Sequence, residues 1–205
     1  MGPYFQTCGL RIKMRQKAYL PCLPEVSWYL LRLEFGFDTN YLGSEAYEKQ
    51  TTRNRFSILT SNGIQWITIP VESTHGNHTP YAEIKISAEF RPKKILTAIQ
   101  SAYGKSAYYD FVMDDLSAIF SSEERLLFNF NQRLLDWTLE WCKNEFKFTP
   151  NDELSIMHEK AEFQFHPYLH VFSDRFPFHP NLSILDVIFN KGRFDLNQLG
   201  CVKKS

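Results

Sequence analysis

The sequence predicts a single α/β domain in which a small mixed or antiparallel sheet packs against about four to five helices. Two observations predict it: β-rich runs flank an Asn-Gly pair, and several other segments repeat apolar residues every three or four positions. The 205 residues suffice for one hydrophobic core but not comfortably for two. Residues 18–205 form the expected domain, after a poorly patterned extension over residues 1–17.

Strands are expected where β-branched and aromatic residues alternate or run together. Residues 56–71 carry two such runs on either side of Asn62-Gly63, which predicts a hairpin because both turn residues tolerate a positive φ. Residues 82–87 alternate between apolar and charged side chains, which predicts a third strand. Residues 163–178 are aromatic and interrupted by prolines, which favours a strand or an extended segment over a helix.

Helices are expected where apolar side chains recur on one face. Ser121 and Glu124 have the spacing of a capping box, which predicts that the longest helix opens at Ser121. Asn181 is expected to cap the last helix and Gly192 to close it. The five segments with this period are residues 26–36, 95–103, 112–120, 121–141 and 182–189.

Charge and cysteine content narrow the class of protein. The chain has 23 basic and 23 acidic residues, whereas capture of nucleic acid through phosphate charge calls for a basic excess. We therefore expect no nucleic-acid partner. The four cysteines are scattered without a CxxC pair, which indicates reduced thiols and a cytoplasmic location. No run approaches the ~18 apolar residues that a membrane span needs. The oligomeric state stays open.

Metal and covalent chemistry find little support in the sequence. His75 and His78, like His166 and His170, have ligand-like spacing, but neither pair has a third ligand close by. Cys22 follows a proline turn, yet no base can be assigned to it, and a buried cysteine is the simpler interpretation. No phosphate-binding glycine loop, serine elbow or HExxH motif occurs. We expect no metal and no cofactor, and the catalytic residues are unknown.

The densest polar cluster spans residues 45–55, directly before the first β-rich run. If it is extended, alternate side chains from Tyr47 to Arg55 point to one side, and such a row can hold a diphosphate through its guanidinium groups. If it is helical, Lys49 and Arg53 still meet one turn apart. The alternative is a solvated charged strand in which two glutamates pair with the basic residues.

This cluster also carries a resemblance to a known family. Residues 18–21 (AYLP), 47–55 (YEKQTTRNR) and 180–186 (PNLSILD) are similar, in the same order, to motifs of WbqC-like bacterial proteins. An aromatic residue is common in the family where Thr52 stands here, so a stacking role does not carry over. No family role carries onto Cys22. The smaller matching motifs lie at residues 62–63, 68–71, 93–94, 101–103 and 128–129.

The resemblance implies a part in bacterial surface-polysaccharide (O-antigen) biosynthesis. The expected substrate is an anionic small molecule, a nucleotide-activated sugar, and the expected reaction is transfer of an acyl or aminoacyl group to an amino sugar. The basic residues would hold the phosphates, the two amide side chains would orient the sugar, and one of the tyrosines would supply stacking or proton transfer. The expected substrate-binding residues are Tyr19, Tyr47, Lys49, Gln50, Arg53, Asn54, Arg55 and Tyr103.

A second hypothesis is a non-catalytic binding or assembly module that recognises a nucleotide sugar or a partner enzyme. Its motivation is the lack of an assignable catalytic pair beside many aromatic residues, which are enriched at interfaces. The aromatic segment of residues 163–178 would then form the partner surface. Burial of that segment tests whether it is a partner surface. The partner-surface version fails if Phe165, Tyr168, Phe172 and Phe176 all belong to the core.

Overall fold

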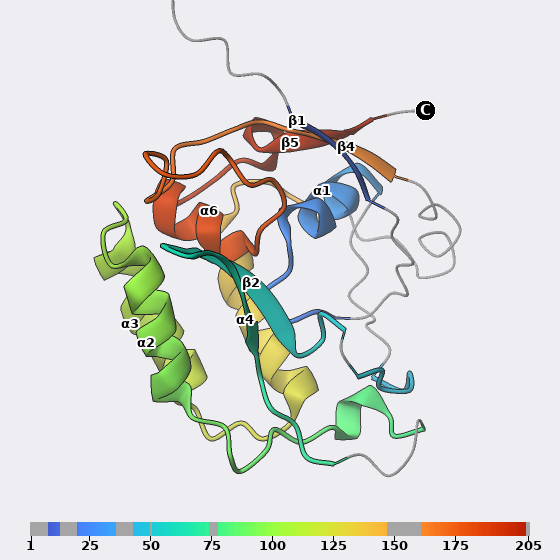
Figure 1. Cartoon of the computed structure of the whole chain (residues 1–205). Helices are drawn as coiled ribbons and strands as arrows, with labels where there is room; N and C mark the ends of the chain where they lie inside the picture. Colours follow the sequence, from blue (N-terminus) through green and yellow to red (C-terminus); the bar gives the residue numbers. More distant parts are fainter. Residues whose placement is uncertain are drawn as a thin grey trace, which may run out of the picture.

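The computed structural model describes residues 8–12, 20–35, 43–49, 51–73, 78–146 and 161–203. Within these ranges the chain forms one mixed α/β domain with two small antiparallel sheets and five α-helices, which confirms the predicted fold class. Figure 1 shows β1, β4 and β5 together at one end of the domain and the β2–β3 hairpin farther down, with α6 between them in this view.

The hairpin forms the two-stranded sheet. Strand β2 (Arg55–Thr60) pairs with β3 (Gly63–Thr68), and α2 (Pro92–Tyr103) and α6 (Ile184–Lys191) both contact β2. The predicted Asn-Gly turn is not confirmed. Gly63 already pairs with Thr60, so the loop consists of Ser61 and Asn62, and only Gly63 of the Asn-Gly pair has a positive φ, at 99°. The positive φ is therefore adopted by the first residue of β3, directly after the two-residue loop.

The second sheet has the order β1-β4-β5, with both pairings antiparallel. It consists of β1 (Cys8–Ile12), β4 (Ala161–Phe165) and β5 (Gly200–Lys203). Phe163 and Phe165 of β4 are buried and stack with ring centroids 5.9 Å apart. Beyond β4, residues 166–180 contain neither helix nor strand, so the predicted extended segment is regular only in its first residues.

The described helices lie where the apolar period predicts them. They are α1 (Val26–Phe35), α2, α3 (Tyr109–Phe120), α4 (Leu127–Trp141) and α6, with short 3-10 turns η1 (Tyr81–Glu83) and η2 (Leu196–Gln198). Their apolar faces meet in one core that includes Phe120, Phe130 and Phe189. In the described part of the chain, no helix is long and apolar enough to cross a membrane.

Two predicted helix starts are wrong. Helix α4 begins after Leu126, and the Glu124 carboxylate accepts a hydrogen bond from the Leu126 backbone N–H at 2.8 Å, so Ser121 opens no capping box. Helix α6 is capped by Ser183, whose hydroxyl accepts from the Leu185 N–H. Asn181 instead adopts a positive φ of 65° two residues earlier. The N-cap residue of α4, Leu126, has no capping side chain, and the Asn181 side chain accepts from the Ser27 N–H of α1 instead of capping α6.

The third predicted strand, over residues 82–87, is also wrong. Residues 81–83 form the 3-10 turn η1, and beyond it only isolated bridges join Val71 to Ile86 and Lys85 to Leu126. Ile84 and Ile86 are buried, as their alternation suggests, but they enter the core from an irregular segment. Alternation therefore predicted the buried face correctly and the strand pairing incorrectly.

Candidate functional site

The polar block of residues 47–55 adopts neither of the two conformations considered for it. Its described residues before Arg55 form turns and bends, and β2 begins only at Arg55. The Thr51 hydroxyl donates to the Glu48 carbonyl at 3.0 Å and accepts from the Arg53 N–H at 3.4 Å, a local bonding pattern that competes with strand and helix. Lys49 is exposed and Arg53 buried, so these side chains make no row on one face.

Arg53 is a buried cation at the centre of an ion-pair cluster whose two glutamates are partly exposed. Its side chain is 0% exposed, and its Nη2 and Nη1 atoms lie 3.4 Å from Glu45 Oε2 and 3.9 Å from Glu48 Oε2. The guanidinium carbon is 5.4 Å from the Tyr81 ring centroid. The Arg53 carbonyl accepts a hydrogen bond from Asn131 Nδ2 at 2.6 Å. Arg53 thereby joins the segment before β2 to η1 and α4.

Two further residues of the block also hold the fold together. Tyr47 is buried and stacks on Tyr81 at 6.1 Å, and burial raises the pKa of its phenol although Arg53 and a neighbouring arginine oppose the shift. Asn54 Nδ2 donates to the Ile69 carbonyl at 2.9 Å, and the Asn54 carbonyl accepts from the Ile69 N–H at 2.7 Å. These two bonds close the open end of the hairpin.

The remaining predicted site residues are not gathered at this cluster. Arg55 is half-buried at the start of β2, with its guanidinium 6.0 Å from the Trp66 ring centroid. Tyr19 and Gln50 lie outside the described residues. Tyr103 belongs to a different polar centre, built on α6. Substrate binding by these residues stays a prediction.

The second polar centre surrounds Asp186 in the first turn of α6. Its carboxylate is 2% exposed and accepts two phenol hydrogen bonds, from Tyr103 OH to Oδ1 at 3.1 Å and from Tyr168 OH to Oδ2 at 2.6 Å. The Tyr103 oxygen in turn accepts from the Leu59 N–H of β2 at 3.4 Å. One carboxylate therefore links α6 to α2, to β2 and to the irregular segment after β4.

Asp186 is an ionisable group that is shielded from water, and its burial shifts the pKa values of the whole centre. Burial raises the pKa of Asp186, and hydrogen bonds from Tyr168 and Tyr103 together with His170 and His179 act in the opposite direction. Burial and the neighbouring carboxylate raise the pKa of both tyrosines, so the phenols keep their protons. Burial lowers the pKa of His170. Perturbed groups of this kind cluster at functional sites.

A cavity of about 370 Å³ lies beside this centre, a size typical of small-molecule sites. Three segments form its walls: the hairpin turn at Ser61, the end of α2 over residues 100–105, and residues 171–175. Lys105 and Arg175 contribute positive charge, and Asp174 contributes one carboxylate, 3.8 Å from the Arg175 Nε atom. The cavity therefore offers two cations for an anionic ligand.

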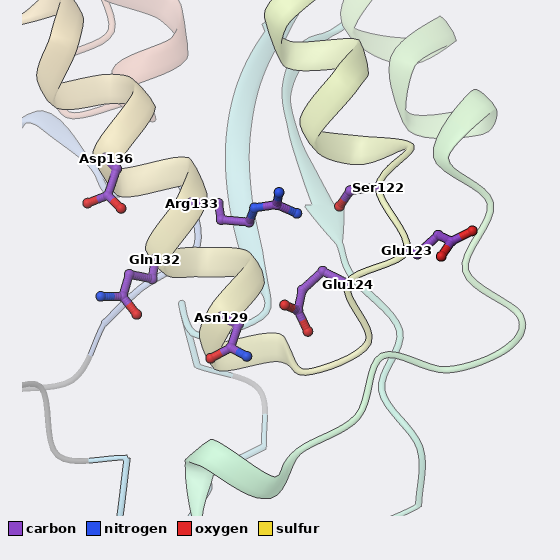
Figure 2. A pocket seen from close by; sticks show the side chains of 7 residues that line it. All are labelled: Ser122, Glu123, Glu124, Asn129, Gln132, Arg133 and Asp136. Atoms are coloured by element: carbon purple, nitrogen blue, oxygen red, sulfur yellow. The ribbon is translucent and has the colours of Figure 1, made fainter.

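A larger hollow of about 780 Å³ lies between α4 and the loop before it, but its side chains do not converge. In Figure 2, Arg133 points toward Ser122 and Glu124, whereas Glu123 is directed away. Gln132 and Asp136 project from the opposite side of α4. Because one cation faces a carboxylate there and the other groups point elsewhere, we consider the Asp186 cavity the better candidate.

The comparisons with known proteins assign the chain to a family. Residues 40–171, more than half of the chain, match the family described as the WbqC-like protein family. The chain belongs to the WbqC-like protein family. The match takes in the Arg53 cluster, Tyr103 and Tyr168, and ends before Asp186.

One relative adds a partial alignment. This WbqC-like chain is 34% identical over 91 residues to the uncharacterized protein Rv1507c of Mycobacterium tuberculosis. The alignment covers 44% of the chain and 39% of that relative, so it spans about two fifths of the relative's length. No solved structure gives a significant match.

Two other chemical candidates can be judged from the structure. Cys22 is 1% exposed, and burial raises the pKa of its thiol far above the usual range, which disfavours the thiolate that a nucleophile requires. Among the residues that the structure describes, no three His, Cys, Asp or Glu side chains are grouped to hold a metal ion. His75 lies outside the described residues.

The aromatic segment after β4 is only partly buried. Phe165 is 1% exposed, whereas Tyr168, Phe172 and Phe176 are half-buried. Leu169 is 75% exposed. Because these aromatic residues do not all belong to the core, the hypothesis of a partner surface in this WbqC-like protein is not eliminated.

Sequence reasoning missed most of the Asp186 centre. It singled out Tyr103 as a binding residue and considered Tyr168 only as part of the aromatic partner surface, and it assigned no role to Asp186, Lys105 or Arg175. A usable signal was present, because residues 101–103 and 180–186 both carry the family resemblance. The structure joins those two motifs through the Tyr103–Asp186 hydrogen bond, across 83 residues of sequence.

Asp186→Asn is expected to change the pH dependence of stability. Because the folded-state pKa of Asp186 is raised above the ordinary 3.8, the native state binds this proton more tightly than the unfolded state. The contribution of this proton to the free energy of unfolding is complete below the pKa of Asp186 in the unfolded state. It is lost as the pH rises through the pKa of Asp186 in the folded state. The amide cannot titrate, so the wild type should gain stability relative to the variant as the pH falls from about 7 to about 4.

Urea unfolding of both proteins at pH values across this window provides the measurement. The difference in unfolding free energy between them cancels the contribution of titrating groups that do not interact with Asp186. A difference that stays constant over the window would contradict the raised pKa, and a wild type that loses stability relative to the variant as the pH falls would indicate a carboxylate stabilised in its charged form.

Proposed function

We propose that this WbqC-like protein acts in bacterial surface-polysaccharide biosynthesis on a nucleotide-activated sugar, which it binds in the cavity beside Asp186. The observation that carries the proposal is the pair of cations, Lys105 and Arg175, that line one cavity. The net charge of the chain is zero, so the attraction for an anion has to be local. A cavity of this kind provides it.

The two cations suit different parts of a diphosphate. The planar guanidinium of Arg175 can bind two phosphate oxygens side by side, whereas the Lys105 ammonium acts as a compact point charge. Asp174, next to Arg175, limits its net attraction, so both cations are needed to hold the doubly charged group. The exposed ends of both side chains can reach into the cavity without loss of buried contacts.

The reaction in this proposal is acyl or aminoacyl transfer to an amino sugar. The amine forms a C–N bond to the acyl carbon, the bond from that carbon to its activated donor breaks, and the amine loses one proton. An acceptor for that proton is required. No residue is assigned to that role, because Asp186 is 2% exposed, does not line the cavity and already accepts hydrogen bonds from Tyr103 and Tyr168.

A thermal-shift screen against nucleotide-activated sugars, free nucleotides and inorganic phosphate tests the binding step. A ligand at 100 times its dissociation constant adds about 2.7 kcal/mol to the folded state, which is a readily visible shift. We expect one sugar nucleotide to stabilise the wild type but not the Lys105→Ala/Arg175→Ala variant. Lys93→Ala, exposed in the first turn of α2, is the matched control and should respond as the wild type does.

A flat panel would sink the proposal, as would an equal shift in the double variant. Incubation of the stabilising sugar nucleotide with an activated acyl donor then separates the two functional hypotheses. Mass spectrometry should find the acylated sugar if the protein is a transferase. Stabilisation without any transfer would favour the binding or assembly module, which the exposure of Leu169 supports.

A further inference from the structure

We infer that Asp186 is a positioning residue that sets the spacing of all three cavity walls through its two tyrosine partners. The inference rests on the proposed function for what occupies the cavity, but its geometry is independent of any ligand. Each wall contains, or lies within a few residues of, a group bonded to this carboxylate or to one of its tyrosines.

The first wall is the end of α2. Tyr103 lies between the lining residues Ala102 and Gly104, and its hydroxyl donates to Asp186 Oδ1 at 3.1 Å. Its ring also stacks on Phe189 of α6, with centroids 4.6 Å apart and planes 6° from parallel. The phenol and the ring therefore fix the end of α2, with Lys105 just beyond it, against α6.

The second wall is the irregular segment of residues 171–175. Tyr168, three residues before it, donates to Asp186 Oδ2 at 2.6 Å. Asn190, one turn farther along α6, accepts from the Val171 N–H at 3.1 Å and donates to the Asp186 backbone carbonyl at 2.7 Å. Because the segment has no helix or strand of its own, these bonds to α6 determine where Arg175 is held.

The third wall is the hairpin turn. The Leu59 N–H, two residues before Ser61, donates to the Tyr103 oxygen at 3.4 Å. The same phenol therefore serves two walls, accepting from β2 and donating to Asp186. An apolar side chain at position 186 would release both tyrosines, because it has no acceptor for either hydroxyl.

If Asp186 only stabilised the fold, the loss of its hydrogen bonds would resemble the loss of a buried hydrogen bond elsewhere in the core. The buried bond between Tyr29 OH and Thr138 Oγ1, at 2.6 Å, joins α1 to α4 and involves no residue that lines the cavity. Loss of either bond should lower the stability, and by more at Tyr168 because its acceptor is a carboxylate. Only loss of the Asp186 bonds should loosen the cavity walls.

Amide hydrogen exchange without ligand tests the inference directly. Wild type, Asp186→Leu, Tyr168→Phe and the control Tyr29→Phe are compared over residues 100–106 and 169–176. We expect Tyr168→Phe to raise exchange in residues 169–176 by about fivefold, the effect of one lost buried hydrogen bond, and Asp186→Leu to raise it in both segments. Tyr29→Phe should leave both near the wild-type rate.

Equal changes in Tyr29→Phe and Tyr168→Phe would overturn the inference, because they would reflect global destabilisation alone. So would unchanged exchange over residues 100–106 in Asp186→Leu. A separate titration with inorganic pyrophosphate distinguishes this failure from failure of the proposed function. Coupled walls in a protein that binds no pyrophosphate or sugar nucleotide would leave the positioning role intact and remove the proposed ligand.

Discussion

Arg53→Ala is expected to lower the free energy of unfolding by about 2–5 kcal/mol, the range for truncation of a large, fully buried side chain. The substitution leaves a void beside Tyr81 and takes the cation away from Glu45, which lies 3.4 Å from it. Urea unfolding of Arg53→Ala beside Lys49→Ala gives the comparison. Lys49 is exposed in the same block, so its loss should stay within about 0.5 kcal/mol.

Arg53→Lys is the informative intermediate. It keeps the positive charge but loses the planar fork, so it should restore part of the stability and not all of it. Near wild-type stability of Arg53→Ala would show that the guanidinium is not packed against Tyr81 and the two glutamates. The Arg53 guanidinium would then be available to a ligand, as the predicted row of phosphate-binding side chains required.

Gly200→Ala is expected to destabilise the protein by about 2–3 kcal/mol, as overpacking does in a tightly packed interior. A Cβ atom at this position would lie 2.3 Å from the Gln164 carbonyl oxygen and 3.2 Å from the Phe165 Cα. Both are backbone atoms of β4, so the strands themselves have to separate. Thermal unfolding of Gly200→Ala and of Cys201→Ala, an exposed neighbour on β5, provides the measurement and its control.

The consequence for the candidate site is indirect. Strand β4 leads into the segment that carries Tyr168. Just beyond the paired residues of β4 and β5, the His166 N–H donates to the Leu199 carbonyl at 2.8 Å. Separation of β4 from β5 should therefore also raise amide exchange over residues 169–176. Wild-type stability of Gly200→Ala would contradict the close approach of the two strands.

The helices and the hairpin could be predicted because their signals are local. The apolar period placed all five described helices, and the paired β-rich runs placed β2 and β3. The predictions that failed depended on choices between equivalent local signals. Ser183 rather than Asn181 caps α6, and the alternating segment around Ile84 found no strand to pair with over its length.

The site was harder to predict because its contacts are long-range. Arginine is normally exposed, so burial of Arg53 could be inferred only from the position of Glu45 and Tyr81 in space. Tyr103 was selected, but its partner Asp186 lies 83 residues later. No periodicity or spacing rule links two such positions.

The central claim is that the ligand occupies the cavity beside Asp186, and mapping of amide chemical shifts tests it most directly. The sugar nucleotide that stabilises the protein is titrated into isotope-labelled wild type. We predict that the largest changes fall on Ser61, residues 100–105 and residues 171–175, and that Lys105→Ala/Arg175→Ala abolishes them. Changes centred instead on residues 47–55, or on the hollow around Arg133, would contradict the account.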